Sequence, residues 1–198
     1  MQSERQQQIV QKAMDIISED GLQGLTTKNL AKQLGLSEPA LYRHFENKVA
    51  ILSGVLEYFQ KNTETLFSKS VTEDMTPFEK IATFFRNNFY TFTEHPSFVV
   101  VIFSDELYRN EHSLNATITL IRHANRKRLL SILESGQQSG NIRSDVLKEH
   151  LALILMSTLR NFVSNWQLAG RQFSLIASGE ELLSALGKLL ESPSIQTD

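Results

Sequence analysis

The sequence predicts an all-α protein, and two observations carry that prediction. Apolar residues recur with a helical period in segment after segment, as in the stripe Ile9, Ala13 and Ile17 near the start of the chain. The 198 residues include only 9 glycines and 4 prolines, too few for a β-protein with many tight turns. No segment alternates polar and apolar residues over a useful length, so no strand is expected.

Helix-start and helix-end signals divide the chain into about nine helices. Three hydroxyl residues stand three positions before a Gln or Glu, the pattern of a capping box: Ser3, Thr76 and Ser178. Three glycines stand where periodic segments end, as expected for left-handed C-caps: Gly21, Gly140 and Gly170. The helices predicted from these signals are 4–20, 27–34, 38–44, 48–69, 77–94, 97–109, 111–139, 145–169 and 179–191.

Composition and charge exclude several classes of protein. Hydrophobic residues make up 41% and charged residues 21%, as in an ordinary globular domain. The chain has no cysteine, which removes disulfides, thiolate catalysis and thiolate metal sites. The net charge of −2 excludes a globally basic nucleic-acid binder and leaves room for a locally basic face. No apolar run approaches the roughly 20 residues that cross a bilayer, and the start lacks a signal-peptide pattern. We therefore expect a soluble cytoplasmic protein without a membrane partner.

Residues 26–48 carry the most specific pattern in the chain. Two short predicted helices flank a turn that contains Gly35, where a left-handed backbone favours glycine. Ala31 is small where the second helix must cross closely, and Leu41 falls on the inner face of that helix. This spacing is the packing pattern of a helix-turn-helix.

The same segment carries an unusual distribution of charge. Lys28 and Lys48 each follow an expected N-cap, Thr26 and Asn47, although the helix dipole disfavours a cation in the first turn. A phosphate would compensate both lysines. Residues 26–48 hold four basic and two acidic side chains, whereas residues 1–25 hold two basic and four acidic ones. The basic excess is therefore local, as a docking face for nucleic acid requires.

Residues 8–54 resemble the DNA-binding region of the tetracycline-repressor (TetR/AcrR) family of transcription regulators. The resemblance rests on Gly-Leu-Gln-Gly-Leu-Thr-Thr-Lys-Asn-Leu-Ala and on Leu-Gly-Leu-Ser-Glu-Pro-Ala-Leu-Tyr-Arg-His-Phe-Glu-Asn-Lys, above all its Leu-Tyr-x-His-Phe-x-x-Lys part. It implies a DNA-binding domain at 1–47, followed by a helical ligand-binding and dimerisation domain at 48–198. It also implies a homodimeric, ligand-responsive repressor of an inverted-repeat operator.

The positions that match the family's DNA contacts lie in or beside the two short helices. They are Thr27, Lys28, Ser37, Ala40, Tyr42, Arg43, His44 and Lys48. Glu38 departs mildly from the pattern, because an acid can accept from a cytosine amine but repels phosphate.

An aromatic-rich region predicts where an effector binds. Residues 78–108 hold many aromatic residues, most of which are expected to be ordinary core. Phe85, Phe89 and Phe92 follow a helical stripe, and a later predicted helix carries a similar stripe of aromatic residues. The side chains expected to line an effector pocket are Phe85, Phe89, Phe92, Phe103, Phe162 and Trp166. Charges are scarce around these positions, so the effector should be mostly hydrophobic or aromatic. Arg122 or His123 could hold a polar end of it, although the run 122–128 is interpreted mainly as a solvated helix face.

The last two predicted helices are expected to pair with their mates in a homodimer. Gly187 lies inside a helix, where glycine costs about 1 kcal/mol relative to alanine, and a close helix approach would explain it. The predicted interface residues are Leu186, Gly187 and Leu190.

No pattern in the chain indicates an enzyme, a metal site or a cofactor. None of the five histidines has a Glu three residues before it, as a helical di-iron site requires, and no catalytic constellation is recognisable. The sequence thus predicts a DNA-binding regulator released by a small hydrophobic ligand. The alternative is a nucleoid-associated or division-linked DNA-binding protein of the same fold without an inducer.

Overall fold

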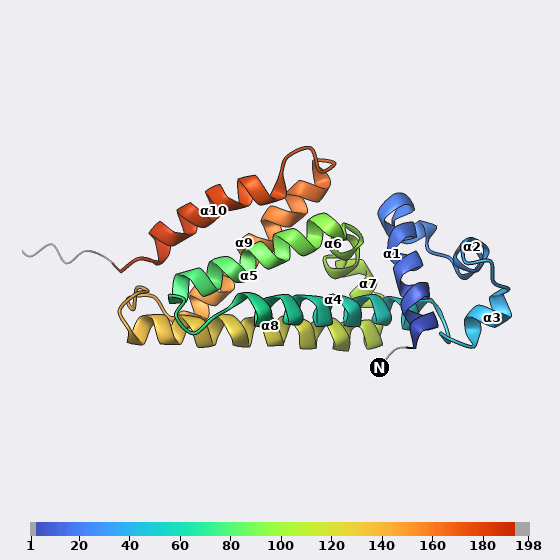
Figure 1. The fold of residues 1–198 in the computed structure, drawn as a ribbon, viewed down its shortest axis with the longest axis horizontal. Helices are drawn as coiled ribbons and strands as arrows, with labels where there is room; N and C mark the ends of the chain where they lie inside the picture. The colour runs from blue at the N-terminus through green and yellow to red at the C-terminus, as the bar shows by residue number, and fades with distance from the viewer. Residues whose placement is uncertain (1–2, 193–198) are drawn as a thin grey trace, which may run out of the picture. The chain divides into compact units, whose positions relative to one another are not determined.

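The computed structural model of the protein describes residues 3–192, without the side chain of Asn110. This part of the chain is helical and contains no strand, so the predicted all-α class is confirmed (Figure 1). Its helices are α1 (Glu4–Gly24), α2 (Thr27–Gln33), α3 (Glu38–Tyr42), α4 (Lys48–Ser70), α5 (Pro77–Glu94), α6 (Ser97–Ile102), α7 (Asp105–Asn110), α8 (His112–Gln138), α9 (Lys148–Leu168) and α10 (Leu175–Leu190). Residues 1–2 and 193–198, the ends of the two predicted domains, lie outside the described residues.

The segment predicted as one helix over 97–109 forms two helices, α6 and α7. The Ser104 hydroxyl accepts a hydrogen bond from the Leu107 amide (3.3 Å), so a new helix begins where the first one ends. The buried Tyr108 hydroxyl then donates to the Val101 carbonyl (2.7 Å), which ties α7 back onto α6. The prediction of about nine helices was therefore short by one.

Two of the three predicted capping boxes form, and the third does not. Ser3 exchanges hydrogen bonds with Gln6, and Thr76 does so with Glu79. The Ser178 prediction was wrong, because α10 begins one turn earlier, where the Ser174 hydroxyl accepts from the Ala177 amide (3.1 Å). Ser178 and the glycine after it consequently lie inside the helix.

The described chain forms two compact units. The first contains residues up to Asn62 together with Phe92–Ile121, and the second contains Thr63–Thr91 together with the residues from Arg122 onward. Helices α4, α5 and α8 contribute residues to both units. In the first unit, the buried stripe of α1 packs against α6 and α2.

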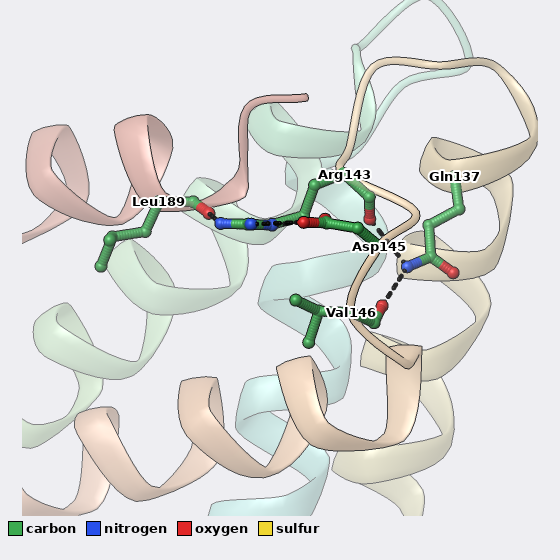
Figure 2. Close-up of polar contacts among 5 residues, drawn as sticks. All are labelled: Gln137, Arg143, Asp145, Val146 and Leu189. Carbon is green, nitrogen blue, oxygen red and sulfur yellow. Dashed lines mark hydrogen bonds and ion pairs between the residues drawn. The ribbon is translucent and has the colours of Figure 1, made fainter. Parts of the chain in front are cut away.

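In the second unit, the loop between α8 and α9 closes the end of α10. Figure 2 shows the Arg143 guanidinium between the Leu189 carbonyl (3.2 Å) and the Asp145 carboxylate (2.7 and 2.8 Å). This guanidinium lowers the pKa of Asp145. The Gln137 amide donates to the carbonyls of Arg143 and Val146 (2.8 Å each). Because these residues build the loop, the helix predicted from 145 begins at Lys148.

None of the helices in residues 3–192 combines the length and the apolar character that a bilayer crossing requires.

Candidate functional site

Helices α2 and α3 form the predicted helix-turn-helix. Thr26 and Ser37 cap the two helices through their hydroxyls, which accept from the amides of Asn29 (3.1 Å) and Ala40 (3.3 Å). Gly35 has φ of +63°, the left-handed conformation expected for the turn. On the inner side, Leu30, Ala31 and Leu41 are buried, so the polar residues of α3 are left to face outward.

The predicted DNA-contact residues lie in and around this pair of helices. Lys28, Ser37, Tyr42 and Arg43 are exposed, and the others are half-buried: Thr27, Ala40, His44 and Lys48. The structure brings α2 and α3 together through Thr27, whose Oγ1 lies 3.5 Å from the Tyr42 hydroxyl. The carbonyl of His44 accepts from the Gln6 side chain (3.0 Å), which ties the residue after α3 to α1.

Lys48 has an intramolecular partner that the sequence did not reveal. Asn47 caps α4 as predicted, accepting from the Ala50 amide (2.9 Å). The Lys48 ammonium donates to the Leu22 carbonyl (2.9 Å), near the end of α1, and partial burial lowers the pKa of Lys48. Leu22 follows Gly21, whose φ of +70° interrupts the helical geometry of α1, so a backbone carbonyl just beyond that break compensates the cation. No short sequence pattern indicates a contact between residues 26 positions apart.

Glu38 also has a partner within the helix-turn-helix. The Thr27 hydroxyl donates to its carboxylate (Oγ1 to Oε2, 3.1 Å), and both side chains are half-buried. The acid that departs from the family pattern therefore links the first residue of α3 to the first residue of α2.

In the second unit, six phenylalanine rings form a continuous row. Neighbouring ring centroids are 5.5–6.4 Å apart along Phe67, Phe84, Phe85, Phe89, Phe162 and Phe173. The Trp166 indole joins this row through a hydrogen bond from its Nε1 to the Phe173 carbonyl (3.0 Å). Four of the six predicted effector residues, Phe85, Phe89, Phe162 and Trp166, are therefore grouped here. The other two, Phe92 and Phe103, belong to the first unit, where their rings are 5.7 Å apart.

Arg128 stands at one end of the ring row. Its guanidinium lies 4.6 Å from the centroid of Phe67 and donates to the Asn125 side chain (3.1 Å). The residue is half-buried, and this burial lowers the pKa of Arg128. Arg122 and His123 are exposed. The basic run 122–128 of α8 is thus not uniformly solvated. Arg128 differs in exposure from Arg122 and His123 because it is the residue of the run that contacts Phe67.

The residues predicted for the homodimer interface have partners within their own chain. Leu186 and Leu190 are each 4% exposed. A Cβ on Gly187 would lie 3.0 Å from the ring of Phe78, so an intramolecular contact already explains this glycine. The exposed large apolar residues in and beside α9 and α10 are Leu147, Leu153, Ile154, Leu168, Ile176 and Leu189.

Two family models cover most of the chain. Residues 9–55 match "Bacterial regulatory proteins, tetR family", and residues 77–190 match "Tetracyclin repressor-like, C-terminal domain". The chain belongs to the TetR family. It is accordingly a DNA-binding transcription regulator and not an enzyme.

Named relatives match this TetR-family chain over different lengths. The class A tetracycline repressor of Escherichia coli is 47% identical over 49 residues, which is 25% of this chain and 23% of that repressor. The fatty acid metabolism regulator protein of Bacillus subtilis is 24% identical over 90% of this chain and 92% of its own. The nucleoid occlusion factor SlmA of Vibrio atlanticus is 34% identical over 40% of this chain and 41% of its own.

Solved structures share the complete TetR-family fold. The fatty acid degradation regulator FadR of Bacillus halodurans has a TM-score of 0.83 at 17% identity, covering 99% of this chain and 98% of its own. The transcriptional regulator FadR of Bacillus subtilis, solved in complex with stearoyl-CoA, has a TM-score of 0.80 at 23% identity. The match covers 91% of this chain and 96% of that regulator.

Proposed function

We propose that the protein is a homodimeric repressor that binds an inverted-repeat operator and is released by a long-chain acyl-CoA. The observation that carries the proposal is the capped α2–turn–α3 pair, which buries its apolar residues and presents polar ones. Residues 1–47 are proposed as the DNA-binding domain and 48–198 as the ligand-binding and dimerisation domain. Such a repressor would act in the cytoplasm, on chromosomal DNA.

In this proposal α3 enters the major groove and flanking residues hold the phosphates. The N-terminal part of a recognition helix contacts base edges in this geometry, and two copies read half-sites about one helical turn apart. Lys28 and Lys48 are the proposed phosphate-binding cations, and Tyr42, Arg43 and His44 complete the docking face with Thr27, Ser37 and Ala40.

Replacing either proposed phosphate-binding lysine should weaken binding to every DNA sequence alike. Lys28→Ala and Lys48→Ala should each flatten the slope of log affinity against log salt by about one unit, because each removes one released counterion. Only Lys48→Ala should also lower stability, by about 1 kcal/mol, since it loses the bond to Leu22. Lys61→Ala, at an exposed lysine of the same helix as Lys48 and outside residues 26–48, is the matched control. Wild-type salt slopes in both test variants would contradict the proposed docking face.

The ring row of the second unit supports an amphiphilic effector. Its phenylalanines pack against one another, so an acyl chain would enter this apolar row by moving the rings apart. The half-buried Arg128 at one end, near Glu64, would offer a cation for an anionic group. A half-buried guanidinium favours a charged acceptor, because water competes less for it than at an exposed site. The relatives named for fatty acid metabolism and for a stearoyl-CoA complex agree with this chemistry. Effector binding would favour a placement of the two recognition helices that no longer fits successive major grooves.

Stearoyl-CoA should quench or shift the emission of Trp166, the only tryptophan, and release operator DNA over the same concentration range. Arg128→Ala should raise the Kd for stearoyl-CoA about tenfold or more, because a charge-assisted hydrogen bond is lost. Arg126→Ala, at an exposed arginine of the same helix, is the control and should bind as wild type. Release of DNA without any change in Trp166 emission would place the effector site elsewhere.

Exposed apolar side chains support a homodimer through α9 and α10. Leu147, the N-cap of α9, stands seven residues before Ile154, and Leu168 stands fourteen residues after it, so the three lie near one face of the helix. An exposed apolar surface of this kind marks an interaction site more often than an isolated leucine does. The proposed interface therefore uses these exposed residues, beside the buried Leu186 and Leu190.

A second candidate function keeps the DNA binding and omits the inducer. The similarity to nucleoid occlusion factor SlmA, which extends over 40% of this chain, favours this candidate. In that case DNA binding would not respond to stearoyl-CoA, and the bound sites would be spread over the chromosome rather than gathered at a few promoters. Mapping bound sites in cells separates the two candidates.

A further inference from the structure

The bond between Thr27 and Glu38 determines which hydrogen-bonding groups the helix-turn-helix presents. A threonine hydroxyl has one proton, and Thr27 donates it to the Glu38 carboxylate (3.1 Å). With its proton used, Thr27 Oγ1 can only accept hydrogen bonds, through its lone pairs. The Tyr42 hydroxyl is directed toward one of these lone pairs. An ionised glutamate has only acceptors as well. Together the two side chains therefore present acceptors and no donor.

A pair of acceptors cannot hydrogen-bond a phosphate, whose oxygens are acceptors too. Its complement in DNA is an N–H group on a base edge, and the major groove offers two such groups, the N4 amine of cytosine and the N6 amine of adenine. Adenine places its N7 acceptor beside the amine, which repels a carboxylate. Cytosine has no major-groove acceptor of its own and is the base that Glu pairs with best.

We propose that Thr27 and Glu38 act as one acceptor pair that selects cytosine at one position of each operator half-site. The inference rests on the proposed DNA binding and adds the chemistry of one base contact. Glu38 makes the contact, and Thr27 is a positioning residue that holds the carboxylate through its single proton. The position of Glu38 at the start of α3 agrees with this, since the first residues of a recognition helix contact base edges.

Selection of bound sites from random DNA tests the pair, with wild type compared to Glu38→Gln. Wild type should prefer cytosine at one position in each half-site by about 5- to 150-fold. Glu38→Gln should exchange that cytosine for adenine, because a glutamine amide both donates and accepts and fits N7 and N6 together. The preferences at all other positions should stay unchanged. An unaltered preference in Glu38→Gln would overturn the inference.

Thr27→Val separates positioning from simple phosphate contact. Valine keeps the shape and removes the proton, so the cytosine preference should fall. The midpoint of thermal unfolding should fall slightly as well, because the bond to Glu38 is lost. On an operator that carries adenine in place of that cytosine, Glu38→Gln should bind as tightly as wild type binds the original operator. A Thr27→Val variant that weakens all sequences equally, with the cytosine preference intact, would refute the coupling. If wild type selects no inverted repeat, the proposed function fails and this inference fails with it; a selected repeat without the exchange rejects this inference alone.

Discussion

Replacing Phe89 with alanine should lower the free energy of unfolding by about 3–5 kcal/mol. The Phe89 side chain is 1% exposed and lies in the middle of the ring row, with Phe85 and Phe162 at centroid distances of 5.9 and 5.5 Å. Its ring also occupies the space beside Gly179, where an added Cβ would lie 2.4 Å from ring atom Cε2. Truncation therefore removes buried apolar surface and leaves a cavity. Because α10 packs tightly here, its residues cannot move far enough to close that cavity. Chemical denaturation monitored by circular dichroism measures the loss.

Gly179→Ala provides the test of that packing. In wild type the added methyl group overlaps the Phe89 ring, so we expect a loss of about 1–3 kcal/mol from overpacking. In the Phe89→Ala background the space is empty, and alanine is about 1 kcal/mol better than glycine inside a helix, so the same change should stabilise. Tyr90→Ala, an exposed neighbour on α5, should stay within about 0.5 kcal/mol of wild type. Equal effects of Gly179→Ala in both backgrounds would show that the two residues do not meet.

A glutamate at Ile154 should dissociate the proposed homodimer and weaken binding to a two-half-site operator by about 100- to 10,000-fold. Ile154 is 50% exposed, and Leu168, two heptads further along α9, is 84% exposed. In the dimer, the introduced carboxylate would lose its hydration at the centre of the apolar interface without gaining a partner. In the monomer it stays in water, so the substitution favours dissociation. The affinity for a single half-site should not change, because the helix-turn-helix is intact. Analytical ultracentrifugation and operator titration measure the two effects.

The control for the Ile154 variant is Leu120→Glu. Leu120 is exposed as well but lies on α8, so this variant should remain dimeric and bind the operator as wild type. A glutamate at Leu186 would be less informative, since burying a charge inside the second unit unfolds the monomer as well as separating a dimer. Sedimentation of Ile154→Glu as an intact dimer would exclude this face of α9 as the interface.

The features that the sequence determined by itself depend on residues a few positions apart. Ser3 and Thr76 cap helices with partners three residues on, and Gly35 occupies the left-handed turn that its place between two short apolar segments predicts. The all-α class and the helix-turn-helix follow from such local patterns, because helix periodicity and capping act within one or two turns. Where two local signals compete, as at Ser174 and Ser178, the pattern alone selected the wrong helix start.

The tertiary structure decided which residues meet across long stretches of chain. It directs Lys48 to the Leu22 carbonyl and places Glu38 beside Thr27, and it turns Leu186 into the core of its own unit. Likewise, the half-buried Arg128 differs from its exposed neighbours only because its helix turns it toward Phe67. A charge or a leucine has the same appearance in the sequence whether it meets solvent, its own chain or a ligand. The packing of helices distant in sequence selects among these environments, and with them the residues left free to act.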